Sequence, residues 1–327
     1  SFFEAETDCP AAILGPVFSS KDPQALQAFI ASAEVFSLEF ENTPVADVGV
    51  LTQTKTLHPP RLALATAQNR LAEKGLFDEL AIPVAPYRAV DSLESLKQAV
   101  AELGLPIVLK TVTGGYDGKG QFVLRSEDQI DTAWAELGPA KSLIAESFVK
   151  FSREVSIIAV RGQDGDVKTW ALAENHHHNG ILSHSIVPAP NSTDLQPVAQ
   201  DYITRLLNHL NYVGVLTLEL FVTEQGLYAN EMACRVHNSG HWSIEGAICS
   251  QFENHIRAVA GLPLGATDVV RPTVMVNIIG QHPKSEDVLA LKGAHLHLYN
   301  KSERAGRKLG HITLMPNNSD ELTDLCR

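Results

Sequence analysis

The fold of this chain is decided by the stretch Leu109-Lys110-Thr111-Val112-Thr113-Gly114-Gly115-Tyr116-Asp117-Gly118-Lys119-Gly120-Gln121. Apolar residues precede it and resume after it, and four glycines fall within seven residues between them. This pattern predicts a strand, a flexible loop and a second strand. Because glycine accepts positive φ and has no side chain, such a loop can bring several backbone N–H groups close to a polyphosphate. The alternative is a plain hairpin turn, so the loop alone does not establish nucleotide binding.

This loop differs from the usual phosphate-binding motifs. It lacks the spacing G-x-x-x-x-G-K-[ST], the chain contains no G-x-G-x-x-G, and no helix is predicted directly after the loop. Support for nucleotide binding therefore has to come from other parts of the chain.

The composition is that of a soluble globular protein. Its 327 residues, 44% of them hydrophobic, are enough for two or three domains. A net charge of −12 argues against nucleic acid or an anionic membrane as partner, and no apolar run approaches the roughly 20 residues that span a bilayer. The first residues do not resemble a signal peptide. Four cysteines without C-x-x-C spacing favour a reduced, cytoplasmic location.

The order of helix and strand signals predicts an α/β protein whose central part is α+β. Helix and strand signals alternate over the first residues, as in a domain with a parallel sheet, and His58-Pro59-Pro60 marks its end. One long amphipathic helix is predicted over residues 61–80, and another begins at the capping-box sequence Asp91-Ser92-Leu93-Glu94. The predicted domains cover residues 1–59, 60–262 with a lid at about 84–150, and 263–327, which is small and rich in strands.

Two glutamates are predicted to face each other across a hairpin. A three-residue loop between strands at 213–222 and 227–231 would place Glu219 directly opposite Glu231. Like charges opposed in this way are unfavourable, whereas a divalent cation between them would make the pairing favourable. Mg²⁺ suits such oxygen ligands, with Mn²⁺ as a second candidate, and Asn230 could add an oxygen. The alternative is that one glutamate faces water.

Three further segments concentrate polar side chains. Cys234-Arg235-Val236-His237-Asn238-Ser239-Gly240-His241-Trp242 has no helix or strand periodicity and predicts a loop that binds an anionic, hydroxyl-rich ligand. Lys301-Ser302-Glu303-Arg304-Ala305-Gly306-Arg307-Lys308 predicts a basic patch for phosphate. For both, the alternative is a solvated turn. Glu174-Asn175-His176-His177-His178-Asn179-Gly180 predicts a polar loop with one imidazole against a ligand, in preference to a zinc site.

Together these features resemble the ATP-grasp fold, in which a lysine, a glycine loop and two later glutamates follow in this order. The runs G-G-Y-D-G-K-G-Q, N-E-x-x-x-R-V-H-N-S-G-H-W and R-x-G-R-K-x-G-H are similar to the N5-carboxyaminoimidazole ribonucleotide synthase family of purine biosynthesis. The similarity extends over nearly the whole chain. It implies an ATP-dependent ligase that joins bicarbonate to aminoimidazole ribonucleotide, with ATP, Mg²⁺ and a homodimer.

The resemblance also implies roles for individual residues. Arg70 and Lys110 would face the ATP phosphates. A mobile, ATP-binding lid over them would consist of Gly115, Tyr116, Asp117, Gly118, Lys119, Gly120 and Gln121. The rest of ATP binding would involve Glu146, Ser147, Phe148, Val149, Glu154, His177, Asn230 and Glu231, with Glu219 and Glu231 as metal ligands. The ribonucleotide and bicarbonate would contact Glu41, Arg235, His237, Asn238, Ser239, Gly240, His241, Lys301, Arg307 and Lys308. The catalytic residues would be Tyr116, Arg235, His241, Lys301 and Arg307.

The chain departs from the family pattern at both ends. The segment that resembles Asp8-Cys9-Pro10-Ala11-Ala12 is not preceded by the family's opening strand and G-x-G-Q-L-G turn, and the family's usual last segment does not follow residue 325. The first domain is therefore expected to lack its leading strand and to expose a parallel sheet edge.

The implied reaction begins with phosphoryl transfer from ATP to bicarbonate, which gives carboxyphosphate. The exocyclic amine of the ribonucleotide then takes the carboxyl group, either directly or through released CO₂. His241 and Tyr116 are the candidates for the group that accepts the amine proton. Two alternatives stay open. One is another ATP-grasp ligase, such as a formate-dependent glycinamide ribonucleotide transformylase or a biotin carboxylase, and the other is a non-catalytic ATP sensor.

Overall fold

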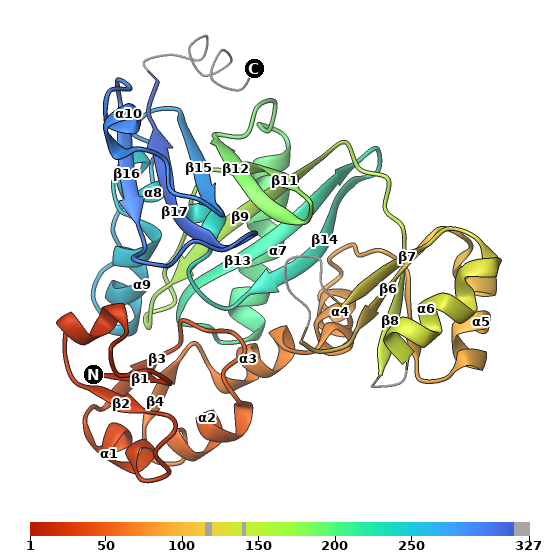
Figure 1. Cartoon of the computed structure of the whole chain (residues 1–327), viewed down its shortest axis with the longest axis horizontal. Helices are drawn as coiled ribbons and strands as arrows, with labels where there is room; N and C mark the ends of the chain where they lie inside the picture. The colour runs from red at the N-terminus through yellow and green to blue at the C-terminus, as the bar shows by residue number, and fades with distance from the viewer. Residues whose placement is uncertain (115–119, 139–141, 317–327) are drawn as a thin grey trace.

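The computed structural model describes residues 1–114, 120–138 and 142–316 of the chain. Figure 1 shows an N-terminal region, an arm of yellow helices and strands on the right, and a large central sheet that continues into the blue C-terminal strands. None of the helices in these described ranges combines the length and the apolar character that crossing a membrane requires.

The N-terminal region contains two pairs of parallel strands, as the alternating pattern predicts. Parallel neighbours require a connection that crosses back over the sheet, and helices supply it here. The first α-helix begins at Ala25, and the strand that follows it spans only Val35–Ser37. The elements are β1 (Phe2–Glu4), η1 (Pro10–Ile13), β2 (Val17–Ser19), α1 (Ala25–Ala31), β3 (Val35–Ser37), α2 (Val45–Leu51) and β4 (Thr56–His58).

The single long helix predicted over residues 61–80 is wrong. The structure has two helices there, α3 (Arg61–Ala67) and α4 (Arg70–Glu79). Asn69 between them has an extended backbone, and its side chain caps α4 by accepting two backbone hydrogen bonds of 3.1 Å. The next backbone N–H, of Arg70, donates to the carbonyl of Val112 at 3.0 Å. A contact with a distant strand therefore accompanies the break in the helix, which the local pattern does not reveal.

The arm on the right of Figure 1 is a four-stranded antiparallel sheet with two helices, and we call residues 87–147 the lid subdomain. The strand order among its described residues is β5-β8-β6-β7, and the helices share a core with the sheet. Its elements are β5 (Tyr87–Val90), α5 (Leu93–Leu103), β6 (Ile107–Thr111), β7 (Gln121–Leu124), η2 (Glu127–Gln129), α6 (Ile130–Leu137) and β8 (Leu143–Ser147).

Two local predictions for the lid subdomain can be checked. The strand–loop–strand prediction for the glycine stretch is confirmed, because β6 and β7 pair with Lys110 opposite Gln121. The predicted capping pair of α5, Asp91 with Glu94, is one residue too early. Ser92 caps the helix instead, and Ser95 completes the reciprocal hydrogen bonds.

The central sheet contains nine strands among the described residues. Its order is β14-β13-β9-β11-β12-β15-β17-β16, with the short β10 beside β9, so the C-terminal strands extend the same sheet. The strands are β9 (Arg153–Arg161), β10 (Val167–Thr169), β11 (Ala173–His178), β12 (Ile181–Val187), β13 (Gly214–Thr223), β14 (Gly226–Ala233), β15 (Thr273–Ile279), β16 (Ala294–Leu298) and β17 (Lys308–Leu314).

Helices cover both faces of this sheet. Successive residues of β9 point to opposite faces, so Ile157 packs with α7 (Leu195–His209) while Ile158 packs with α9 (Gln251–Val259). This double burial explains why the middle of β9 and the first half of β13 are buried residue after residue, without the alternation of a strand that has one face in water. The remaining short helices are η4 (Asn238–Gly240), α8 (Ser243–Gly246) and α10 (Ser285–Leu289).

The polar loop predicted over residues 174–180 is wrong for most of its length. Glu174 to His178 belong to β11, which pairs with β9 on one side and β12 on the other. Its buried Asn175 hydrogen-bonds Ser156 and Ser185 on these two neighbours. Strand pairing on both sides therefore overrides the polar composition that suggested a loop.

Candidate active site

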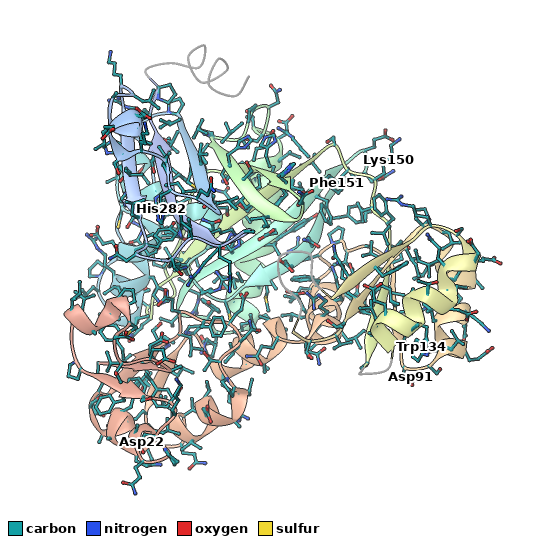
Figure 2. The ribbon with its side chains drawn as sticks, in the orientation of Figure 1. Asp22, Asp91, Trp134, Lys150, Phe151 and His282 are labelled. Carbon is teal, nitrogen blue, oxygen red and sulfur yellow. The ribbon has the colours of Figure 1, made fainter. Side chains whose placement is uncertain are left out.

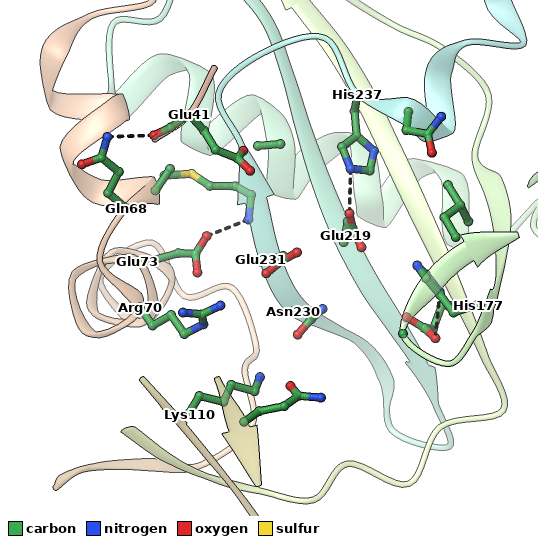
Figure 3. Close-up of a pocket in the computed structure, with 18 of the residues that line it drawn as sticks. Glu41, Gln68, Arg70, Glu73, Lys110, His177, Glu219, Asn230, Glu231 and His237 are labelled. Carbon is green, nitrogen blue, oxygen red and sulfur yellow. Dashed lines mark hydrogen bonds and ion pairs between the residues drawn. The ribbon is translucent and has the colours of Figure 1, made fainter. Parts of the chain in front are cut away.

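A cleft of about 950 Å³ opens where the lid subdomain, the α3–α4 corner, the central sheet and the first region meet. Figure 3 shows it from inside, with side chains from all four pointing toward the same space. Many residues predicted from the sequence line it: Glu41, Arg70, Lys110, Gln121, Phe148, Glu154, His177, Glu219, Asn230, Glu231, Arg235, His237, Asn238 and Lys308.

Other predicted residues are not brought to the cleft wall. Gly120, Ser147, Val149, Ser239, Gly240, His241, Lys301 and Arg307 do not line it. Glu146 is buried at its edge, where it contacts a lysine that does line the cleft. The predicted loop residues Gly115, Tyr116, Asp117, Gly118 and Lys119 lie outside the described residues.

The two predicted metal ligands face each other, although by a different route from the one expected. The turn between β13 and β14 is tight, with Thr223 paired to Gly226, and would by itself shift the pairing. A register shift beside Glu219 leaves Asn230 as the extra residue of a β-bulge, so that Glu219 pairs with Glu231. The predicted three-residue loop is therefore wrong, while the predicted pairing is confirmed.

The environments of these two carboxylates differ. Burial works against ionisation of Glu219, but the nearby His237 imidazole outweighs it and lowers the pKa of Glu219. His237 Nε2 lies 2.9 Å from Glu219 Oε1, and Nδ1 accepts the backbone N–H of Ser239 at 3.3 Å, so Nε2 is assigned as the donor. Glu231 opens onto the cleft, yet the surrounding protein and the facing Glu219 raise its pKa.

This pair can hold a divalent cation only with help from a ligand. Among the described residues, no group of three or more His, Cys, Asp or Glu side chains is arranged as a metal site. Mg²⁺ commonly binds one or two carboxylates together with substrate phosphates, so two glutamates on a cleft wall suit it better than they suit zinc. The geometry therefore fits a metal that arrives with a phosphorylated ligand.

The lid subdomain contributes positive charge on the opposite side of the cleft. Lys110 Nζ of β6 lies 3.1 Å from Glu146 Oε1, and the lysine is still partly exposed to the cleft. Arg70, at the start of α4, donates from Nη1 to the carbonyl of Thr111 at 2.9 Å and also lines the cleft. Two cations thus face the carboxylates of β13 and β14, as Figure 3 shows.

One end of the cleft combines aromatic rings with an ion pair. The rings of Phe151 and Phe221 stack with centroids 4.6 Å apart, and both line the cleft. Figure 2 shows Phe151 where the chain leaves the lid subdomain for β9. Nearby, His177 Nδ1 lies 3.2 Å from Glu154 Oε1. Burial acts to lower the pKa of His177, but the Glu154 carboxylate dominates and raises it. Flat apolar faces beside polar groups suit a nucleoside.

At the other end of the cleft, the N-terminal region lies against the central sheet. Arg235 Nη2 donates to Glu41 Oε1 at 2.9 Å, and both residues line the cleft. Gln68 Nε2 holds the loop that carries Glu41 by donating to the carbonyls of Glu41 and Thr43 at 2.7 Å each. Asn238 is fixed by reciprocal hydrogen bonds with Asn277 at 2.7 and 2.9 Å. This end offers a planar guanidinium and amide groups for an anionic ligand.

Two of the predicted residues that miss the cleft, His241 and Lys301, contact an aromatic cluster that contains Tyr299 and His311. His241 Nδ1 lies 3.1 Å from Gln251 Nε2, and burial together with His311 holds the pKa of His241 well below its usual value. Lys301 Nζ lies 5.4 Å from the centre of the Tyr299 ring. Of the four cations in the predicted basic patch, Lys308 alone lines the cleft.

Sequence reasoning missed two residues of α4, Glu73 and Lys74, which are 3% and 1% exposed. Burial raises the pKa of Glu73 to about 8, although Lys74 beside it acts in the opposite direction. Glu73 lies four residues before Phe77, which is fully buried, and therefore shares its helix face. A carboxylate on the apolar face of a helix is the signal that could have revealed it.

Two family models match the chain. The ATP-grasp domain model matches residues 75–252, and the model described as phosphoribosylaminoimidazole carboxylase C-terminal domain matches residues 273–324. The first match contains Lys110, Glu219 and Glu231 and covers more than half of the chain. The second begins with β15.

Several curated relatives share one name. The N5-carboxyaminoimidazole ribonucleotide synthases of Pseudomonas aeruginosa and Brucella melitensis are 45% and 47% identical to this chain. The first alignment covers 96% of this chain and 87% of the relative, and the second covers 95% and 88%. The enzyme of Bacillus subtilis is 45% identical over 92% of this chain and 80% of its own.

Solved structures agree with these relatives. The N5-carboxyaminoimidazole ribonucleotide synthetase of Thermus thermophilus superposes with a TM-score of 0.93 at 44% identity, over 99% of this chain and 89% of that one. The Aspergillus clavatus enzyme, in complex with ADP and 5-aminoimidazole ribonucleotide, gives a TM-score of 0.89 at 28% identity over 98% and 88%. The fold around the cleft is therefore an ATP-grasp fold.

Proposed function

The chain belongs to the N5-carboxyaminoimidazole ribonucleotide synthase family of ATP-grasp ligases, and we propose that its cleft joins bicarbonate to aminoimidazole ribonucleotide with conversion of ATP to ADP and phosphate. The observation that carries this proposal is the composition of one cleft. Lys110 and Arg70 lie on one wall and Glu219 and Glu231 on another (Figure 3). Arg235 lines the same cleft, where it is hydrogen-bonded to Glu41. Three substrates that all carry negative charge would meet between these groups.

ATP would bind with its base near Phe151 and Phe221 and with its phosphates between Lys110 and Arg70. The segment 146–149 would border the adenine, and Glu154 with His177 would contact the ribose. Support comes from the stacked rings at 4.6 Å and from the 3.2 Å contact that holds His177 on Glu154. A second support is the exposed part of Lys110, whose charge is free to approach a phosphate because Glu146 engages it only from behind.

A divalent cation, Mg²⁺ or Mn²⁺, would be held by Glu219 and Glu231, with Asn230 beside them. The fit rests on charge: Glu219 and Glu231 are opposed like charges, and His237 compensates only the first. When bound, the cation would neutralise charge on the transferred phosphoryl group. His237 would then fix the orientation of Glu219 by its hydrogen bond, as outer-shell partners commonly do.

In the first step, a bicarbonate oxygen would attack the terminal phosphorus of ATP, and the bond to the ADP oxygen would break. In the second step, the amine nitrogen of the ribonucleotide would attack the carbon of carboxyphosphate, phosphate would leave, and the amine would lose one proton. Lys110 and Arg235 would stabilise negative charge at the two ends of this sequence. Because the cleft lies between the lid subdomain and the sheet, water would have limited access to the labile intermediate.

The roles of the residues behind the cleft would be indirect. His241 would be neutral at physiological pH, since burial and His311 lower its pKa, and it would support the loop that carries His237 through Gln251. Tyr116 and His241 both stay candidates for the group that accepts the amine proton; His241 does not line the cleft, and Tyr116 lies outside the described residues. Lys301 and Arg307 would contribute positive potential near Lys308, which reaches the cleft.

We also propose a cytoplasmic homodimer with small-molecule substrates and with neither nucleic acid nor a membrane as partner. The net charge of −12 supports the last part. The wide spacing of the four cysteines in the sequence, without a C-x-x-C pair, supports a reducing compartment. Light scattering of the purified chain would measure the oligomeric state.

A phosphate-release assay tests the proposed reaction. We expect bicarbonate with aminoimidazole ribonucleotide to stimulate ATP turnover, and formate with glycinamide ribonucleotide to leave it at the background rate. Stimulation by formate instead would identify the transformylase reaction. An ADP signal that stays flat with every substrate pair, while ATP still binds, would identify a sensor and overturn the proposal.

A further inference from the structure

An acidic and a basic residue that follow each other on α4 are both buried, and the proposed reaction gives neither of them a role. Glu73 is 3% exposed and Lys74 is 1% exposed. Taking a charged side chain out of water is unfavourable unless its charge and hydrogen bonds are compensated. The groups that compensate these two side chains therefore indicate what they hold in place.

Both side chains bind the backbone of β14, one on each side of Glu231. The backbone N–H of Met232 donates to Glu73 Oε1 at 2.7 Å, and Lys74 Nζ donates to the carbonyl of Asn230 at 2.7 Å. Asn230 is the extra residue of the bulge, where the regular strand pairing is interrupted. Adjacent residues of one helix thus supply partners to the backbone immediately before and after a predicted metal ligand.

Lys74 also contacts the lid subdomain. Its Nζ lies 3.5 Å from Glu146 Oε2 on β8, and the other oxygen of Glu146 lies 3.1 Å from Lys110 Nζ. A continuous chain of charged contacts therefore runs from the bulge through Lys74 and Glu146 to the cation that faces the cleft. Figure 3 shows Glu73 beside Glu231 on the cleft wall, with Lys110 across from them.

We propose that Glu73 and Lys74 are positioning residues that orient the Glu231 carboxylate for metal binding and couple this orientation to the lid subdomain through Glu146. The inference rests on the proposed function, because it takes Glu231 as a metal ligand. It adds two residues that hold the backbone of β14, of which Glu73 also borders the cleft. Each acts through the backbone beside Glu231, so each should affect metal and nucleotide binding together.

A purely structural role would give a different result, and paired variants separate the two. Glu73→Gln keeps an oxygen that can accept the Met232 N–H, whereas Glu73→Leu removes it. Lys74→Arg keeps a buried donor and charge, whereas Lys74→Met removes both. Arg161→Met is the matched control, because Arg161 also donates to a backbone carbonyl, that of Tyr212 at 2.9 Å, and does not line the cleft.

The test measures binding of Mn²⁺ in the presence of ADP, from the loss of the free Mn²⁺ electron paramagnetic resonance signal, alongside the melting temperature. We expect Glu73→Leu and Lys74→Met to weaken Mn²⁺ binding about 10-fold or more, which is the range for lost outer-shell contacts at metal sites. Glu73→Gln should stay within about 3-fold of the wild type, and Lys74→Arg should recover part of the loss. Arg161→Met should lower the melting temperature without changing Mn²⁺ binding.

If Glu73→Leu and Lys74→Met bind Mn²⁺ like the wild type and are only less stable, the inference is overturned. If Glu73→Leu or Lys74→Met fails to fold, the conservative variants Lys74→Arg and Glu73→Gln test the inference. A positioning role predicts weaker Mn²⁺ binding than the wild type for Lys74→Arg and near-normal binding for Glu73→Gln. Glu231→Ala in the same assay tests the proposed function separately. Unchanged Mn²⁺ binding in Glu231→Ala would refute the metal site itself. If Glu231→Ala loses Mn²⁺ binding while Glu73→Leu and Lys74→Met bind Mn²⁺ normally, only the positioning role is refuted.

Discussion

Glu219 and Glu231 lie directly opposite each other in the β13–β14 ladder, and a single extra residue, Asn230, creates this register. Cross-strand like charges lower stability. The opposition therefore lowers the stability of the free protein, and a cation bound between the carboxylates would remove this cost.

Replacing one of the two opposed carboxylates should affect stability and activity in different ways. We expect Glu231→Gln to melt no lower than the wild type in the presence of EDTA, because it removes a carboxylate whose pKa is raised by the surrounding protein and by the facing Glu219. The same variant should lose about 100-fold or more in kcat/KM, because a metal ligand matters more than the outer-shell contacts, which contribute about 10–100-fold. Differential scanning calorimetry and the phosphate-release assay measure the two quantities.

Glu224→Gln is the control for this prediction. Glu224 is an exposed glutamate in the turn of the same hairpin and does not line the cleft, so both its activity and its melting temperature should stay close to wild type. Normal activity of Glu231→Gln at limiting Mg²⁺ would contradict the metal assignment.

A second prediction concerns the cation on the lid subdomain. Lys110→Met should lower kcat/KM for ATP by about 10²–10³-fold, the range observed when one preorganised charge-stabilising group is removed from an active site. Its Nζ faces the cleft while Glu146, at 3.1 Å, engages it from the buried side. Lys97→Met, on the exposed face of α5, is the matched control and should be near normal. Equal ATP affinity in the two variants, measured by calorimetry, would argue against a phosphate contact for Lys110.

The sequence predicted the regular elements better than the positions of their ends. Strand–loop–strand at the glycine stretch and the hairpin with its two glutamates depend on local signals, namely apolar runs bounded by glycine and turn residues. The break of the predicted helix at Asn69 depends on a different cause. It accompanies a hydrogen bond from Arg70 to Val112 in the lid subdomain, which no local pattern contains.

In the candidate site too, residues marked by a local sequence pattern could be predicted, whereas residues placed by distant contacts could not. Glu219, Glu231 and Arg235 could be identified because the hairpin pattern and the polar segment after it single them out, and the family resemblance adds their roles. Glu73 and Lys74 could not, because charged residues within a helix usually face water, and their burial is imposed by β14 and β8. The histidine run was misjudged for a related reason, since its polar composition hides a strand that is paired on both sides.

A third prediction follows from a histidine that joins the first region to the rest of the molecule. His255 Nε2 lies 2.7 Å from Ser37 Oγ, and Nδ1 accepts the backbone N–H of Val215 at 3.1 Å, so the ring is bound in its neutral form. Burial lowers the pKa of His255 from 6.5 to about 4. Between these values the unfolded chain binds more protons than the folded one, so stability is lost as pH falls through this window.

The expected size of this effect is about 2 kcal/mol between pH 7 and pH 5, from this group alone. Urea unfolding of the wild type and of His255→Asn at the two pH values measures it. The variant should be less stable at pH 7 but should lose about 2 kcal/mol less than the wild type on acidification. His209→Asn, on α7, is the control and should follow the wild type. An unchanged pH dependence in His255→Asn would refute this origin.

The two ends of the cleft should differ in which substrate's KM changes when a residue there is replaced. Glu41 orients Arg235 through a 2.9 Å hydrogen bond and is itself held by Gln68, all at the end away from the Phe151–Phe221 stack. Glu41→Gln should therefore raise KM for the ribonucleotide about 10-fold, equivalent to about 1.4 kcal/mol, while KM for ATP changes less than about 3-fold. Glu34→Gln, which removes an exposed partner of Lys55 in the same region, should change neither constant. Steady-state kinetics with each substrate varied in turn gives both values. A rise in KM for ATP alone would mean that Glu41 and Arg235 belong to the nucleotide end, and the assignment of the two ends would have to be reversed.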